Sequence, residues 1–182
     1  MENYCLSGEE AVLMVIDIQE RLIPAMKYGE KVILNTNILI SIAQKLEIPI
    51  IVTEQYPKGL GKTDPNVSYN LGESLTYEKI TFSGCTSEVT SALQGLGRKK
   101  IIITGTETHV CVFQTVRDLL AQGYQVFVVG DAVCSRTKDN YRNGLSLMAS
   151  MGAVVTNTET VFFDIMKQSG TPLFKELSKL IK

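Results

Sequence analysis

Histidine is almost absent from this chain: of its 182 residues, only His109 is a histidine. Zinc sites that take two or three histidines from one chain are therefore excluded, and so is a Cys₂His₂ zinc finger. Any mechanism that depends on an imidazole has to use His109. The formal net charge is −1, so the chain lacks the excess of basic residues that is typical of proteins that bind nucleic acid, and we expect no nucleic-acid partner.

The chain also lacks closely spaced cysteines and long apolar runs. Its four cysteines, Cys5, Cys85, Cys111 and Cys134, include no CxxC pair. The polar start has no basic segment of the kind that begins a secretory signal. No apolar run approaches the roughly 18 residues that a membrane-spanning helix needs. We therefore expect reduced thiols, a cytoplasmic location and no contact with a membrane.

No linker, internal repeat or low-complexity tract divides the sequence. Its 182 residues lie close to the prior of roughly 150 residues for one domain. A chain of this length can bury a core that is stable without disulfides. We expect a single domain over residues 1–182.

Short apolar segments alternate with longer segments that have the apolar spacing of a helix. The short segments are too hydrophobic to keep one face in water, which favours strands of a parallel sheet that is covered on both faces. We predict an α/β protein with a three-layer, Rossmann-like fold, in which helices flank both faces of a mainly parallel sheet of five or six strands. The expected strands are residues 11–16, 50–53, 100–104, 124–129 and 152–156, and the expected helices are 37–46, a segment that ends at 97, 110–122, 140–151, 160–167 and 172–181.

Polar residues follow each of the first four expected strands. Asp17 follows the first strand, Glu54 and Gln55 follow the second, residues 105–111 follow the third, and residues 131–136 follow the fourth. In open parallel sheets, ligands bind beyond the carboxyl ends of the strands. These residues are therefore expected to share one rim of the sheet, where a site would lie.

Cys111 lies near the start of the helix expected at 110–122. With Thr108 as the N-cap, Cys111 falls in the first helical turn. The positive helix end and its unpaired amides favour a thiolate there, which predicts a lowered pKa and a reactive thiol. The alternative is a small, buried and inert cysteine.

Two charged residues each have a functional and a structural interpretation. A carboxylate such as Asp17, directly after an apolar strand, is costly unless it has a partner or a role, although it could instead cap a helix or lie in a surface turn. Lys79 alternates with apolar neighbours, which is typical of the exposed face of a strand. Its functional interpretation is a cation that keeps a nearby thiolate or carboxylate ionised.

Other motifs offer weaker chemistry. His109 lies two residues before Cys111, about 200° away around a helix, so we expect it to pack locally or to contact a partner subunit. Cys134 is the second thiol on the expected rim. Residues 61–63 lack the upstream glycine of a P-loop. Residues 95–97 lie at the end of an expected helix, whereas the glycines of a dinucleotide-binding motif lie between a strand and the start of a helix. We therefore expect no nucleotide and no other cofactor.

Together these segments resemble the isochorismatase-like cysteine hydrolase superfamily, and most closely its YcaC-related, isochorismatase domain-containing subgroup. The resemblance covers about residues 10 to 165 and is carried by segments that occur in the family's order. They are Asp17-Ile18-Gln19, Lys79 with Phe82-Ser83, Gly105-Thr106-Glu107-Thr108 leading to Cys111-Val112, Asp131-Ala132-Val133 with Ser135-Arg136, Gly152-Ala153-Val154, and Thr158-Glu159.

The resemblance implies a catalytic triad of Asp17, Lys79 and Cys111. Asp17 would take the thiol proton, Cys111 would attack an electrophilic carbon, and Lys79 would steady both charges. The backbone N–H groups of Glu107 and Cys111 would form the oxyanion hole, beside a non-proline cis peptide between Thr106 and Glu107. It also implies a homo-oligomer.

We expect the substrate to be bound by Gln19, Glu54, Gln55 and Thr106, with the irregular segment 55–77 as a functional loop or lid. The metal-binding nicotinamidases of this superfamily carry histidines after the second strand, whereas this chain has none there, so no metal is expected. Members that hydrolyse isochorismate lack the cysteine, so Cys111 argues against that reaction.

Three hypotheses remain open. The first is a metal-independent cysteine hydrolase that acts on a small amide-like substrate through a thioester. The second is a non-catalytic member of the fold that binds a small molecule or a protein partner. The third is a thiol-redox protein that uses Cys111 and Cys134, whose Cα atoms would then have to lie within about 7 Å.

Overall fold

The sheet of the computed structural model, which describes residues 4–181, has six strands in the order β3-β2-β1-β4-β5-β6. Every neighbouring pair of strands is parallel. This is the order of a doubly wound sheet whose direction of winding reverses between β1 and β4. The strands are β1 (Ala11–Ile16), β2 (Ile50–Gln55), β3 (Leu75–Lys79), β4 (Lys100–Thr106), β5 (Gln125–Cys134) and β6 (Val154–Thr156).

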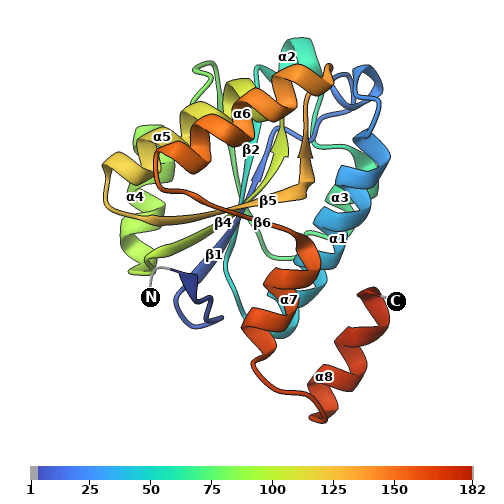
Figure 1. The fold of residues 1–182 in the computed structure, drawn as a ribbon. Coiled ribbons are helices and arrows are strands. Elements are labelled where there is room, and N and C mark those ends of the chain that lie inside the picture. The colour runs from blue at the N-terminus through green and yellow to red at the C-terminus, as the bar shows by residue number, and fades with distance from the viewer. Residues whose placement is uncertain (1–3, 182) are drawn as a thin grey trace.

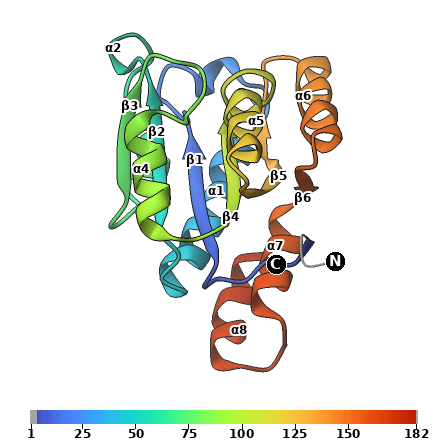
Figure 2. The same ribbon diagram turned by 90° about the vertical axis from the view of Figure 1, so that its left-hand side faces the viewer.

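Helices cover both faces of this sheet (Figures 1 and 2). On one face lie α1 (Gly29–Lys45), α3 (Pro65–Ser68) and α7 (Thr158–Met166), and on the other lie α4 (Ser87–Leu96), α5 (Phe113–Ala121) and α6 (Lys138–Ser150). The short helix α2 (Pro57–Leu60) follows β2, and α8 (Pro172–Leu177) packs beside α1 and α7. The predicted three-layer α/β fold is confirmed, with six strands.

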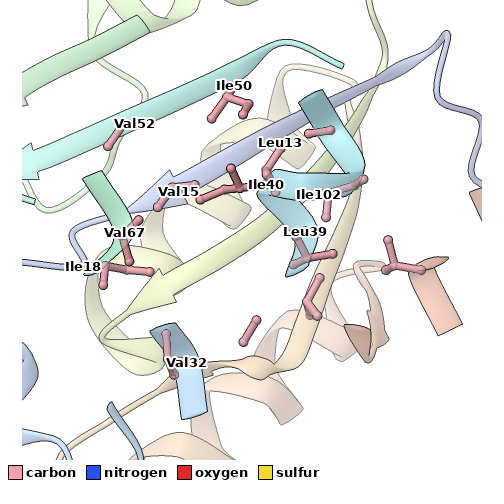
Figure 3. Close-up of a cluster of buried hydrophobic side chains, with 14 of the residues drawn as sticks. Leu13, Val15, Ile18, Val32, Leu39, Ile40, Ile50, Val52, Val67 and Ile102 are labelled. Atoms are coloured by element: carbon pink, nitrogen blue, oxygen red, sulfur yellow. The ribbon is translucent and has the colours of Figure 1, made fainter. Parts of the chain in front are cut away.

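The core is divided by the sheet into two layers. Figure 3 shows the layer under α1, where Ile40 of that helix lies beside Leu13 and Val15 of β1. Alternate residues of the same strand, Met14 and Ile16, point into the second layer, under α4, α5 and α6. Because a strand projects successive side chains to opposite faces, an all-apolar β1 is what a sheet covered on both sides requires.

Some expected boundaries were wrong. Helix α1 begins eight residues before the expected start at 37, because the buried side chains of Val32 and Thr36 already lie on its inner face. Strand β5 continues to Cys134, beyond the expected end at 129. The segment 55–77 is not one loop, since it contains α2, α3 and the start of β3, and an isolated bridge pairs Gln19 with Thr63.

Candidate active site

Asp17 and Lys79 form a buried ion pair at the carboxyl ends of β1 and β3. The Lys79 Nζ atom lies 2.7 Å from Asp17 Oδ2, and neither side chain is exposed. Asp17 follows β1 with a left-handed backbone (φ 51°), which aspartate tolerates better than most residues because its side chain is short and polar. Since a buried carboxylate is costly without a partner, the ion pair accounts for the charge that follows this apolar strand.

Further hydrogen bonds hold this pair in place. The Thr53 hydroxyl donates to Asp17 Oδ1 at 2.7 Å. Besides its bond to Asp17, Lys79 Nζ donates to Gln55 Oε1 at 2.7 Å and to the carbonyls of Thr81 and Phe82 at 3.2 and 3.1 Å. The chain therefore turns over the end of β3 and surrounds the ammonium with oxygen atoms. Lys79 is not on an exposed strand face, which excludes its structural interpretation.

Cys111 completes the cluster from the opposite side of the switch point. It belongs to a π-helical turn, η3 (Thr108–Val112), that precedes α5, and its side chain is buried. The thiol interacts with the Asp17 carboxylate and with the Lys79 ammonium. The three residues that the resemblance assigned to a triad thus lie together, although Asp17 and Cys111 are 94 positions apart along the chain.

The start of this helix differs from the expectation. Thr108 is not the N-cap but the first residue of η3, and Glu107 holds the cap position without a side-chain capping bond. The Val112 N–H donates to the Glu107 carbonyl at 3.2 Å, which closes the wider turn that distinguishes a π-helix. Such turns occur frequently at functional sites, and this one presents the Cys111 thiol to Asp17.

The resting thiol of Cys111 is protonated. Its pKa is raised to about 12, first by burial and then by the neighbouring Asp17 carboxylate, against the opposing influence of Lys79. Burial also raises the pKa of Asp17, while the charge and hydrogen bond of Lys79 oppose that shift. The expectation that the helix start lowers the pKa of Cys111 is therefore wrong, because burial and a like charge outweigh it.

The strand end that precedes the cysteine is held rigidly. The peptide bond between Thr106 and Glu107 is cis, as the resemblance implied. The Thr106 hydroxyl donates to the Asp17 carbonyl at 2.7 Å, which ties the end of β4 to the end of β1. The buried Glu107 carboxylate accepts bonds from the Arg136 backbone N–H at 3.0 Å and from its Nε at 3.2 Å. Arg136 therefore anchors the residue whose N–H was assigned to the oxyanion hole.

Two glycines permit close backbone contacts around this segment: Gly105, which the resemblance included, and Gly144, which the sequence did not single out. Gly105 has φ +131°, and a Cβ there would lie 2.0 Å from the Ile16 carbonyl oxygen. A Cβ at Gly144 of α6 would lie 2.8 Å from the Thr108 carbonyl oxygen of η3. In the sequence, Gly105 follows an apolar run and Gly144 lies within an expected helix. Neither position alone predicts a close backbone contact, because a glycine can occur at such positions for its flexibility.

Residues expected to bind substrate also organise the segment after β2. Gln19 Nε2 donates to the carbonyls of Gln55 at 3.0 Å and Gly61 at 2.7 Å, and its Oε1 accepts the Gln55 N–H at 2.8 Å. Glu54 Oε1 accepts the N–H and hydroxyl of Thr63 at 2.7 and 2.8 Å. The amide of Gln19 and this oxygen of Glu54 are thus already occupied within the chain, and direct contact with a substrate stays a prediction.

The donors available around this segment do not fit a metal. Within residues 4–181, no three His, Cys, Asp or Glu side chains are grouped as ligands. Glu54 Oε2 lies 3.2 Å from the Lys62 ammonium, so a metal ion at this carboxylate would have to compete with the lysine.

The remaining expected residues lie outside the triad. His109 Nδ1 lies 3.0 Å from the Ser135 hydroxyl, so the imidazole packs locally, as expected. Cys134 is buried and opposite Thr106 in the register of β4 and β5. Cys5, Cys85, Cys111 and Cys134 are all free thiols. No helix within residues 4–181 is long and apolar enough to cross a membrane.

A family model described as the isochorismatase domain matches residues 11–160. The chain is 40% identical over 182 residues to the secreted isochorismatase effector Isc1 of Phytophthora sojae, with 97% of this chain and 87% of that protein covered. It is 36% identical to isochorismatase domain-containing protein 1 of Danio rerio over 97% of this chain. That alignment covers 62% of the zebrafish protein, so this chain spans less than two thirds of its length.

Solved structures share the fold over almost the whole chain. The MAR1 ribonuclease of Caenorhabditis elegans, 38% identical, superposes with a TM-score of 0.93 over 97% of this chain and 92% of that one. The YcaC gene product of Escherichia coli, described as an octameric hydrolase of unknown specificity, is 21% identical. It superposes with a TM-score of 0.90 over 98% of this chain and 89% of that one.

Proposed function

The chain belongs to the isochorismatase domain family, and from this premise we propose that it is a metal-independent cysteine hydrolase that cleaves a C–N bond of a small amide-like substrate through a thioester. One observation carries the proposal: the Cys111 thiol interacts with a buried carboxylate, Asp17, that is itself held by Lys79. A nucleophile, a base and a group that orients the base are the parts that covalent catalysis needs.

In the first half-reaction Asp17 takes the proton from Cys111 as the sulfur attacks the amide carbonyl. The new S–C bond pushes an electron pair onto the carbonyl oxygen. When the carbonyl re-forms, the C–N bond breaks and the leaving nitrogen takes the proton from Asp17. The products are a thioester on Cys111 and an amine.

In the second half-reaction water replaces the amine. Asp17 takes a proton from water as its oxygen attacks the thioester carbon, and the C–S bond then breaks. The departing sulfur takes the proton back from Asp17, which releases a carboxylic acid and restores the thiol. The raised pKa of Asp17 suits this exchange, because a more basic carboxylate is a better proton acceptor.

The protonation states of the resting site favour a concerted transfer over a preformed thiolate. With the pKa of Cys111 raised to about 12, almost no thiolate exists at neutral pH. Asp17 therefore has to remove the proton during the attack. Lys79 keeps Asp17 ionised and oriented, since its ammonium lies 2.7 Å from the carboxylate.

The developing oxyanion needs hydrogen-bond donors. We assign this role to the backbone N–H groups of Glu107 and Cys111, which lie on the segment that joins β4 to α5. The bonds from Arg136 to the Glu107 carboxylate support the assignment, because they restrain the residue that presents one of the donors. Fixed backbone donors stabilise an oxyanion strongly because they do not have to reorganise during the reaction.

Location, assembly and the class of substrate belong to the same proposal. We propose a cytoplasmic homo-oligomer that takes a small molecule as its substrate. The octameric YcaC supports an assembly. The ribonuclease name of the nematode relative and the secreted effector of Phytophthora define the alternatives against which RNA cleavage and export have to be checked.

The decisive experiment looks for the thioester. Wild-type protein and the variants Cys111→Ala, Cys111→Ser and Cys134→Ala are mixed with a panel of small primary amides and a single-stranded RNA, and intact mass is followed after rapid quenching. We expect amide hydrolysis and a transient acyl mass on the wild type and on Cys134→Ala. Neither should occur on the two Cys111 variants.

Three outcomes would contradict the proposal. If both Cys111 variants still hydrolyse amides, Cys111 is not the nucleophile. Cleavage of RNA without cleavage of any amide would show that the substrate is RNA and not a small amide. Absence of any turnover, together with binding of a small molecule, would favour the non-catalytic member of the fold.

A further inference from the structure

A cavity lies at the carboxyl end of β5, and it is lined by none of the triad residues. Its volume is about 460 Å³, within the range of small-molecule sites. It is bounded by the end of β5 and by the first turns of α1 and α6, and neither Asp17, Lys79 nor Cys111 lines it. Figure 1 shows α1 and α6 on opposite sides of the sheet, and the cavity takes lining residues from the starts of both helices.

The lining of this cavity is strongly positive. Lys27, Lys31, Arg136 and Lys138 contribute to it, against a single carboxylate, Asp131. The chain as a whole has a net charge of −1, so this clustering does not follow from a general excess of basic residues. A cavity with one sign of charge concentrates ligands of the opposite sign.

These charges have few partners inside the protein. Within residues 4–181, Lys27, Lys31 and Lys138 take part in no ion pair. The Asp131 carboxylate accepts bonds from the backbone N–H and the hydroxyl of Thr158, at 2.8 and 2.9 Å. The one acidic group of the lining is therefore occupied. The Lys27 ammonium lies 5.6 Å from the centre of the Tyr28 ring, and no carboxylate within residues 4–181 pairs with these three ammonium groups.

The two helices add to the positive potential. α1 has 17 residues and α6 has 13, and both begin at the cavity. No side chain caps the start of α1, whereas the Thr137 hydroxyl caps the start of α6 by accepting the Asn140 N–H. Although Glu30 and Asp139 lie in these first turns, neither lines the cavity. Free N–H groups at a helix start bind phosphate and similar anions, so the start of α1 reinforces the cationic side chains.

The floor of the cavity suits the rest of an organic ligand. Buried Val133 and Cys134 line it, and the ring of Tyr141 is fixed by a hydrogen bond from its hydroxyl to the Gly130 carbonyl at 2.8 Å. We propose that this cavity is a binding site for a small organic phosphate. The phosphate lies among the cationic side chains, and the organic part lies against the apolar floor.

The site borders the catalytic segment without belonging to it. Arg136 lines the cavity and also binds the Glu107 carboxylate. A bound phosphate would therefore share Arg136 with Glu107. Binding itself does not rest on the hydrolase activity, so the two proposals can fail separately.

The test is calorimetric titration of the full chain at low salt with inorganic phosphate, adenosine 5′-monophosphate, uncharged adenosine and a short single-stranded RNA. The variant Lys31→Gln/Lys138→Gln removes two charges from the cavity. Its matched control, Lys175→Gln/Lys179→Gln, removes two lysines in and just after α8 that take part in no ion pair within residues 4–181. The control residues lie far from the start of α1 that lines the cavity, because Glu176 of α8 forms an ion pair with Lys45, the last residue of α1.

We expect inorganic phosphate and the monophosphate to bind, adenosine not to bind, and the cavity variant to weaken the affinity about tenfold while the control leaves it unchanged. Thermal unfolding confirms that both variants are folded. The proposal is overturned if neither phosphate binds, if the two variants lose affinity equally, or if the cavity variant keeps full affinity. Binding of RNA without binding of the monophosphate would also overturn it and would indicate a nucleic-acid surface.

Discussion

Lys79 Nζ lies 2.7 Å from Asp17 Oδ2, and both side chains are completely buried. Lys79 is the last residue of the edge strand β3 and Asp17 directly follows β1, and β2 lies between these two strands. The Lys79 ammonium also donates a hydrogen bond to Oε1 of Gln55, the last residue of β2. Through this relationship, the sheet itself holds the carboxylate that interacts with Cys111.

Breaking the buried pair should destabilise the protein and abolish activity. Lys79→Met leaves the Asp17 carboxylate buried without its partner, which typically costs about 3–5 kcal/mol in the free energy of unfolding. Urea unfolding measures the loss. The double variant Asp17→Asn/Lys79→Met should recover much of the stability, because no charge is left unpaired, but none of the activity. A single variant as stable as the wild type would show that the pair does not carry this energy.

The thiol of Cys111 should behave as a protonated group well above neutral pH. Its pKa is raised from 9.0 to about 12, so the rate of alkylation by iodoacetamide should keep rising past pH 9 without a plateau. Peptide mapping by mass spectrometry separates Cys111 from the other thiols. A plateau near pH 9 or below would contradict the shift.

The two neighbours of this thiol should move its pKa in opposite directions. Asp17 is a like charge beside a thiolate and raises the pKa, so Asp17→Asn should shift the alkylation profile to lower pH. Lys79 favours the thiolate, so Lys79→Met should shift the profile to higher pH. Shifts of the same sign in both variants would show that the thiol does not sense these charges.

The same shift predicts how stability depends on pH. The folded pKa of Cys111 lies above that of the free thiol, so the folded state keeps its proton while the unfolded state loses it. This contribution to stability is therefore fully present below pH 9 and is lost as the pH rises towards about 12. Cys111→Ala should flatten the fall in the free energy of unfolding over this range. An unchanged slope would contradict the assignment.

Glu107 should act as a positioning residue through Arg136. Glu107→Gln replaces charge-assisted hydrogen bonds by neutral ones, which should lower kcat by about tenfold with little change in KM, since the oxyanion donor is needed most in the transition state. Steady-state kinetics on the best amide substrate measures both constants. Asp118→Asn, which breaks an exposed pair with Arg117, is the control. An effect confined to KM would indicate substrate binding instead.

Gly105 should tolerate no side chain. Gly105→Ala combines φ +131° with a Cβ at 2.0 Å from the Ile16 carbonyl oxygen, so β4 would have to move away from β1. We expect a loss of more than about 2 kcal/mol in the free energy of unfolding. Gly95→Ala is the matched control, because a Cβ there meets nothing within 4 Å and alanine favours helix α4 by about 0.5–1 kcal/mol. Equal effects of the two substitutions would contradict the structural requirement.

Much of the fold could be predicted from local sequence, because a strand buried on both faces has to be apolar throughout. The run 11–16 corresponds residue for residue to β1. Helix α1 was harder to delimit, since its first turns contain glutamate, lysine and asparagine, and the burial of Asn35 and Thr36 depends on partners elsewhere. Asn35 donates to the Asp131 carbonyl, 96 positions away.

The sequence by itself predicted that an imidazole does not activate the thiol, because the one histidine lies two positions from Cys111 and so projects from another side of a helix. It also placed Asp17 and the cysteine segment on one rim, since parallel strands end at the same edge. Only the tertiary structure decided the burial of Lys79, which depends on carbonyl groups that fold back over β3. The raised pKa of Cys111 likewise depends on burial and on Asp17, because solvation and charge act through space and leave no trace in the local sequence.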